Sequence, residues 1–126
     1  MNNGIKHIAV YGDSILKGAI TGTNSSQLFE IIRENSLALA AETLELELNN
    51  RSVFGSVALK TQKRLNRDIA AGLRADLIIL ESGGNDSDYD WAAVNENPAA
   101  FHTMRTPIED FIGIFDEMIT ACRQNS

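Results

Sequence analysis

The stretch Ile8-Ala9-Val10-Tyr11-Gly12-Asp13-Ser14-Ile15 decides the fold class of this chain. Its apolar first half predicts a short strand that is covered on both faces, and the glycine ends that strand. The strand would therefore carry Ser14 into a turn at its carboxyl end. Because ligands of open α/β sheets bind in the crevice beyond the carboxyl ends of the strands, this turn is a candidate functional site.

Two later stretches have the same form. Leu44 to Asn50 predicts a strand that leads to Phe54-Gly55-Ser56, and Ala75 to Ser82 predicts a strand that leads to Gly83-Gly84-Asn85-Asp86. If the strands are parallel and adjacent, Ser14 meets the glycine of one turn and the asparagine of the other. A hydroxyl, a backbone N–H and a side-chain amide would then share one crevice.

The segments between these strands carry helical patterns. Asn24-Ser25-Ser26 is typical of a helix start, and a helix is predicted from about Gln27 to about Thr43. The apolar positions on one face of this helix would be Leu28, Phe29, Ile32 and Leu39. A second helix is predicted over Ala58 to Leu73. Thr106-Pro107-Ile108-Glu109 predicts the start of a last helix, with the threonine as N-cap.

The predicted fold is an α/β three-layer sandwich with a parallel sheet in the order Leu44–Asn50, Ile5–Tyr11, Ala75–Ser82. The first of these strands alternates leucine with glutamate, which places it at a sheet edge. The last is apolar on both faces, as a central strand should be, but no further strand follows the last helix. We therefore expect one domain over residues 1–126, incomplete at its C-terminus, that can self-associate through the unfinished sheet edge.

Composition narrows the classes of partner. The chain has 126 residues and a formal net charge of −6, which argues against nucleic acid and anionic lipid as partners. A single cysteine, Cys122, allows no internal disulfide and fits a cytoplasmic location. We expect this thiol to serve packing on an apolar helix face. The sequence contains no segment as long as a membrane span and no signal-peptide pattern.

Two motifs suggest cofactors but depart from the patterns that cofactors need. Asp86, Asp88 and Asp90 are spaced like the start of a calcium loop, but Trp91 replaces the expected glycine and Asn97 the closing glutamate. The glycine-containing stretch after the first strand lacks the Lys-Ser/Thr pair of a phosphate loop. We expect no metal site and no bound cofactor.

The three turns together resemble the SGNH hydrolases, also called GDSL-type esterases and lipases. Gly12-Asp13-Ser14-Ile15 is similar to the first block of that family, Asn50 to Gly55 to the second, and Gly83-Gly84-Asn85-Asp86 to the third. The stretch Ser87-Asp88-Tyr89-Asp90-Trp91 is also similar to one branch. The resemblance implies a flavodoxin-like fold and hydrolysis of carboxylic esters through an acyl-enzyme on Ser14.

The resemblance also implies a role for each turn. Ser14 would be the nucleophile, and the N–H of Ser14, the N–H of Gly55 and the side-chain amide of Asn85 would hold the oxyanion. Fixed donors stabilise the charge that develops on the carbonyl oxygen more than they stabilise the ground state. The ester itself stays open: a fatty acyl ester, a carbohydrate acetate and a lysophospholipid all remain candidates.

One block of the family is missing. The acid–base pair lies in an Asp-x-x-His block near the family's C-terminus, and this chain has only His7 and His102. His7 precedes the first strand, and His102 lies in a polar loop, so neither is expected to serve as the base. Two hypotheses follow. The chain is the nucleophile-bearing part of a serine esterase, or it is a non-catalytic α/β module that keeps the crevice for binding.

Overall fold

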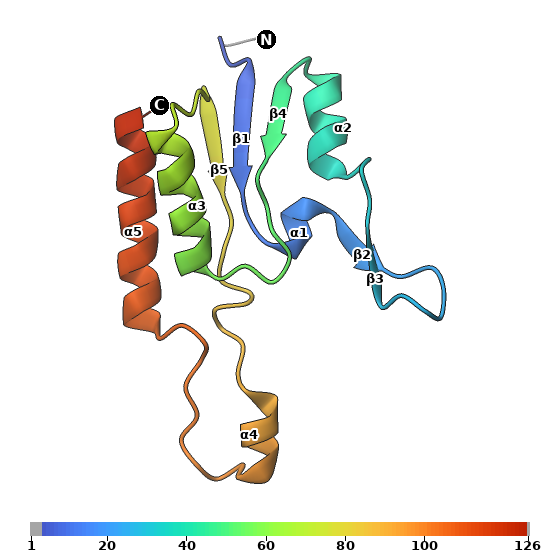
Figure 1. The fold of residues 1–126 in the computed structure, drawn as a ribbon, viewed down its shortest axis with the longest axis vertical. Coiled ribbons are helices and arrows are strands. Elements are labelled where there is room, and N and C mark those ends of the chain that lie inside the picture. Colours follow the sequence, from blue (N-terminus) through green and yellow to red (C-terminus); the bar gives the residue numbers. More distant parts are fainter. Residues whose placement is uncertain (1–3, 126) are drawn as a thin grey trace.

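A three-stranded parallel sheet forms the centre of the computed structural model, which describes residues 4–125 (Figure 1). Strand β1 (His7–Tyr11) lies between β4 (Glu47–Asn50) and β5 (Leu77–Leu80). Both neighbours run parallel to β1, with Ile8 opposite Leu48 on one side and Leu77 on the other. The predicted strand order is therefore confirmed, and each strand is shorter than its predicted range.

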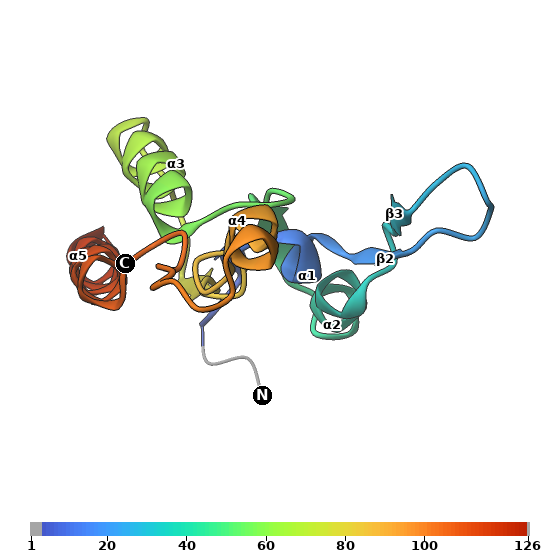
Figure 2. The same cartoon turned by 90° about the horizontal axis from the view of Figure 1, so that it is seen from below.

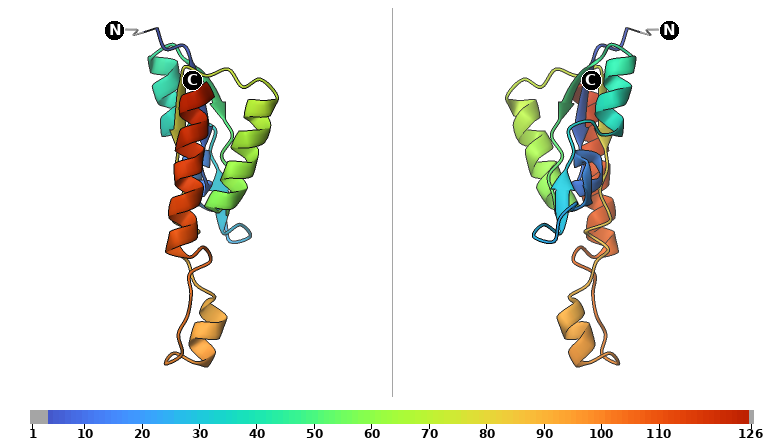
Figure 3. Two further views of the ribbon diagram at one scale, coloured as in Figure 1. Left: turned by 90° about the vertical axis from the view of Figure 1, so that its left-hand side faces the viewer. Right: turned by 90° about the vertical axis from the view of Figure 1, so that its right-hand side faces the viewer.

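Helices cover both faces of the sheet, which gives the predicted three layers. Helix α2 (Ser36–Thr43) packs beside β4, whereas α3 (Ala58–Ala70) and α5 (Ile108–Asn125) pack against each other on the opposite side (Figures 2 and 3). The connection from β1 to β4 passes through α2, and the connection from β4 to β5 passes through α3. Such helical crossovers are what parallel strands require.

The core lies between the sheet and the pair α3 and α5. Successive residues of a strand point to opposite faces, so Ala9 and Tyr11 face this core while the buried Val10 points to the other side. Leu65 from α3 and Met118 from α5 are fully buried against them. Ile69 and Leu73, and on α5 Phe111, Phe115 and Cys122, pack against the same cluster, as predicted for Cys122.

The predicted helix from Gln27 to Thr43 is wrong in its first half. The chain instead forms an antiparallel hairpin of β2 (Ala19–Thr21) and β3 (Phe29–Ile31), and α2 begins only at Ser36. The side chain of Asn35 caps α2 by accepting from the N–H of Ala38 at 3.1 Å. The polar stretch before Gln27 closes the hairpin, and three β-favouring residues after it (Phe29, Ile31 and Ile32) override the helical spacing.

The remaining elements are short. Helix α1 (Ser14–Lys17) follows β1, and α4 (Trp91–Glu96) lies in the long connection from β5 to α5, which projects beyond the sheet (Figure 1). The last helix begins at Ile108, and the hydroxyl of Thr106 bonds Asp86 rather than capping this helix, which differs from the prediction. No helix within residues 4–125 has the length and apolar character that a membrane span needs.

Candidate active site

The turn after β1 is fixed by its aspartate. Asp13 is buried, and its Oδ1 accepts the N–H of Ile15 at 2.9 Å, which caps α1. The N–H of Asp13 in turn donates to Oε2 of Glu81 at 2.9 Å. Ser14 is the first residue of α1 and is half-buried. Within residues 4–125 its N–H donates to no acceptor, so it is available to a ligand.

Glu81 ties the end of β5 to the end of β1. A Cβ on Gly12 would lie only 2.7 Å from Oε2 of Glu81, so a larger residue there would require this carboxylate to move. Burial raises the pKa of the Glu81 carboxyl, and the nearby Asp13 carboxylate raises it further. The carboxyl ends of the two strands are thus joined by a partly buried acidic pair.

The loop after β4 runs along the Ser14 turn. The N–H of Val53 donates to the carbonyl of Gly12 at 3.0 Å, and the amide of Asn50 donates to the carbonyl of Leu16 at 2.7 Å. These bonds hold the loop that contains Gly55 beside the Ser14 turn. The φ of Gly55, +69°, lies in the left-handed region, where a side chain would be strained. The N–H of Gly55, like that of Ser14, donates to no acceptor in the described part of the chain.

Asn85 joins the three turns. Its side-chain Nδ2 donates to Oδ2 of Asp13 at 3.1 Å and to the carbonyl of Ser56 at 3.0 Å. The predicted convergence of the stretches that hold Ser14, Gly55 and Asn85 is therefore present. Both hydrogens of the amide have protein acceptors, so an incoming anion would have to compete for one of them.

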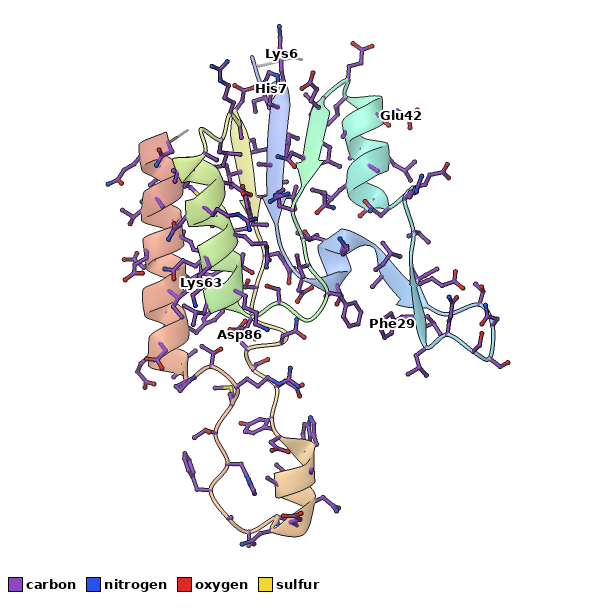
Figure 4. All side chains as sticks on the ribbon, in the orientation of Figure 1. Lys6, His7, Phe29, Glu42, Lys63 and Asp86 are labelled. Carbon is purple, nitrogen blue, oxygen red and sulfur yellow. The ribbon has the colours of Figure 1, made fainter. Side chains whose placement is uncertain are left out.

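Asp86 holds the loop that carries Asn85. It is buried, and its carboxylate accepts the N–H of Ala58 at 2.9 and 3.0 Å, which caps α3. Thr106 donates to the same carboxylate at 2.6 Å, and its N–H bonds the Asp86 carbonyl. Figure 4 shows Asp86 between the end of β5 and the start of α3. One side chain therefore links the Asn85 loop to both helices of the core.

Neither histidine contacts Ser14. His7 lies at the amino end of β1, the opposite end from Asp86 (Figure 4), and its Nδ1 is 3.2 Å from Oδ2 of Asp76. His102 belongs to the projecting segment between α4 and α5, where its Nε2 is 2.7 Å from the carbonyl of Asn97. Residues 4–125 also contain no group of three or more His, Cys, Asp or Glu placed to hold a metal ion.

No role was predicted for three acidic residues, Asp13, Glu81 and Asp86. All three lie at or after the carboxyl end of a predicted strand, which is the signal that could have identified them. A charged residue at such a position is desolvated unless it is bonded, so it must either support the turn or act in it. Arg64 is a fourth contributor, because its Nη2 donates to Oγ of Ser56 at 3.0 Å.

No model of a protein family and no curated protein matches the sequence. Solved structures do match the fold. A protein from Desulfitobacterium hafniense DCB-2 that is assigned to the G-D-S-L lipolytic family superposes with a TM-score of 0.61 at 18% identity, over 95% of this chain and 54% of that one. The esterase AlinE4 of the SGNH-hydrolase family superposes with a TM-score of 0.49 at 18% identity, over 92% of this chain and 71% of AlinE4.

The chain thus spans about half the length of the G-D-S-L protein, with nearly all of its own residues superposed. At this identity the likeness concerns the fold alone. The chain has the SGNH-hydrolase fold.

Proposed function

We propose that this chain carries the nucleophile and the oxyanion donors of a serine hydrolase that acts on small-molecule esters. Ser14 Oγ loses its proton to a general base and attacks the ester carbonyl, the C–O bond to the alcohol breaks and the alcohol leaves with that proton, and water then hydrolyses the acyl-enzyme. The N–H groups of Ser14 and Gly55 and the amide of Asn85 stabilise the oxyanion. The observation that carries the proposal is the position of Asn85, whose amide bonds the residue before Ser14 and the residue after Gly55.

The donors suit a developing negative charge. Neither backbone N–H has an acceptor within residues 4–125, so both can bind an oxyanion without breaking a protein bond. Asn85 supplies a donor that carries no charge of its own and needs no counter-ion. An oxyanion replaces the carbonyl of Ser56 or the carboxylate of Asp13 as the acceptor of one of the two amide hydrogens.

The general base comes from outside residues 1–126 in this proposal. A serine hydroxyl is a weak nucleophile without an adjacent base, and neither His7 nor His102 contacts Ser14. The 126-residue chain should therefore be nearly inactive towards p-nitrophenyl acetate, and a fluorophosphonate probe should label Ser14 weakly. Robust labelling that disappears in His102→Ala would contradict this assignment of the base.

Mutation of the proposed donor tests the chemistry in a protein that includes the acid–base pair. Asn85→Ala should lower kcat by roughly a hundredfold with little change in KM, because the amide acts on the transition state more than on bound substrate. Asn66→Ala, at an exposed asparagine of α3, is the matched control and should leave kcat unchanged. An unchanged kcat in folded Asn85→Ala would remove Asn85 from the mechanism.

A non-catalytic binding module is the second candidate. It is favoured by the fully bonded amide of Asn85 and by the lack of any histidine contact to Ser14 within the described residues. The two candidates differ in the labelling of Ser14 when the base is supplied in solution. Phosphonate labelling that increases with added imidazole and is lost in Ser14→Ala favours the hydrolase. No labelling under these conditions favours the binding module.

The outer edge of β5 is the place where the sheet would be continued. β5 has a neighbour on one side only, and beside it lies an apolar groove of ≈ 320 Å³. The groove is lined mainly by Leu77, Ile78, Leu80, Phe115, Ile119 and Cys122. Exposed strand edges pair with other chains. We propose that the isolated chain self-associates here, and light scattering over a range of concentrations tests it. A monomer at every concentration would contradict this.

A further inference from the structure

A second apolar surface lies on the opposite side of the candidate site from this groove. Phe29 and Ile31 project from β3, and the ring of Phe54 stacks on that of Phe29 with centroids 4.3 Å apart and planes at 21°. The exposed fraction is 48% for Phe29, 45% for Ile31 and 45% for Phe54. We call this set of three residues the aromatic platform. Figure 4 shows Phe29 turned from the hairpin towards the loop after β4.

Two of the three platform residues lie on strand β3 of the hairpin. Residues Phe29 and Ile31 are two apart on one strand, so they share a face, and they pair with Thr21 and Ala19 of β2. Leu28 and Glu30 alternate with them on the other face, where Glu30 accepts from Thr23. The platform itself therefore carries no charged side chain.

The platform adjoins one of the two available N–H groups in the sequence, and an exposed apolar residue adjoins the other. Phe54 immediately precedes Gly55, and Ile15, which is 72% exposed, immediately follows Ser14. The bond from Val53 to the carbonyl of Gly12 keeps the Phe54 loop against the Ser14 turn. An ester carbonyl held by both N–H groups would thus have an apolar side chain next to each donor.

We propose that the aromatic platform is the acyl subsite of the esterase and selects apolar acyl groups larger than acetyl. This inference rests on the proposed function and adds the substrate class to it. An apolar chain gains free energy by covering exposed aromatic and aliphatic surface, up to about 0.8 kcal/mol for each buried CH₂. An acetyl group is too short to cover the stacked rings.

The test is an NMR titration of the ¹⁵N-labelled 126-residue chain with methyl acetate, methyl butyrate and methyl hexanoate. The dissociation constant should fall with each added CH₂, by at most about fourfold. The hexanoate should shift the amide signals of Ile15, Phe29 and Phe54. Phe54→Ala should weaken hexanoate binding by roughly tenfold and leave acetate binding unchanged, because the removed ring is the surface that the longer chain covers.

Leu28→Ala is the matched control. Leu28 is 88% exposed on the same strand end but lies on the other face of the hairpin, so its loss should leave binding unchanged. The amide spectrum of each variant reports directly whether it is folded. Equal affinity for acetate and hexanoate, or shifts confined to the groove beside β5, would overturn the subsite. So would shifts at the platform that depend on protein concentration without any ester, because they would mean that a second copy covers it.

A labelling experiment separates this inference from the proposed function. Ethyl and octyl fluorophosphonates are compared on Ser14 with imidazole as the added base. Faster labelling by the octyl probe, lost in Phe54→Ala, supports both proposals. Equal labelling by both probes keeps the nucleophile and removes the subsite. If ester binding depends on chain length but neither probe labels Ser14, the apolar binding site is supported and the proposed hydrolase function is contradicted.

Discussion

The two ends of β1 hold polar clusters of different kinds. At the carboxyl end, the carboxylates of Asp13 and Asp86 are buried and accept hydrogen bonds from backbone N–H groups and neutral side chains. At the amino end, His7 lies between Asp76 at 3.2 Å and Glu47 at 3.4 Å, and all three side chains are exposed. Both clusters lie at ends of β1, but charged side chains are buried only at its carboxyl end.

This difference predicts unequal consequences of mutation. A buried polar group that loses its partner retains its desolvation cost, about 1–3 kcal/mol. An exposed group that loses its partner is solvated instead, so surface ion pairs contribute little. The carboxyl end is therefore expected to be sensitive to single substitutions and the amino end tolerant of them. The following four substitutions test this contrast from the largest expected effect to the smallest.

Asp86→Ala should cause the largest loss of stability. It removes the cap of α3 and leaves the N–H of Ala58 and the hydroxyl of Thr106 without their acceptor. We expect the free energy of unfolding to fall by about 3 kcal/mol, measured by urea denaturation. Asp116→Ala is the control, because it removes an exposed carboxylate of α5, and its midpoint should stay close to wild type. Equal effects of both changes would remove Asp86 from its linking role.

Asn85→Asp should rank second. It places a carboxylate against the Asp13 carboxylate and the carbonyl of Ser56, so three acceptors meet without a donor. We expect a loss of about 2 kcal/mol at pH 7. The new carboxyl would have a pKa above its unfolded value, so the lost stability should return as the pH falls through that window. A loss that does not depend on pH would contradict the charge argument.

The strands of the site were predictable because their patterns are local. Four apolar residues before Gly12 and four in β5 form continuous apolar runs, which predict strands, and the turns after them follow from glycine and asparagine. The sheet order then follows from right-handed crossovers. The positions of Ser14, Gly55 and Asn85 at one edge needed no further information than this order.

The hairpin was not predictable in the same way. The segment from Leu28 to Leu39 has apolar residues at a helical spacing and also a composition that favours strands. Which structure forms depends on pairing with Ala19–Thr21, a stretch outside this segment. The roles of Asp13 and Asp86 were also hidden, because hydrogen bonds between turns that are distant in the chain leave no periodic signal. Sequence therefore predicted which turns meet but not which side chains hold them together.

Glu81→Gln should increase stability slightly at neutral pH. Burial and the nearby Asp13 raise the pKa of Glu81 above 4.5, so the folded chain binds more protons than the unfolded chain just above that pH. The contribution of Glu81 to stability is thus present at acidic pH, and it is lost as the pH rises through the pKa that Glu81 has in the folded chain. Glutamine keeps an acceptor for the N–H of Asp13 and carries no charge. The melting temperature should rise by roughly 2 °C at pH 7 and should not rise at pH 4. A variant that melts below wild type at pH 7 would show that the charged carboxylate is needed there.

Asp76→Asn should have the smallest effect, because it acts at the exposed amino end. Oδ2 of Asp76 accepts the N–H of Lys6 at 2.8 Å and that of His7 at 2.9 Å, and an asparagine oxygen can accept both. These backbone bonds, with His7, hold the pKa of Asp76 below 3.8. The contribution of the Asp76 carboxylate to stability is therefore present above pH 3.8. It is lost as the pH falls through the lower pKa that Asp76 has in the folded chain.

We expect the melting temperature of Asp76→Asn at pH 7 to lie within a degree or two of wild type, and the gap to narrow as the pH falls below the ordinary aspartate value of about 3.9. The same scan on Asn85→Asp should give the larger and opposite trend, because there acid restores stability instead of removing it. If Asp76→Asn were as damaging as Asp86→Ala, the amino end would be a desolvated cluster like the other. The contrast between the two ends would then lose its physical basis.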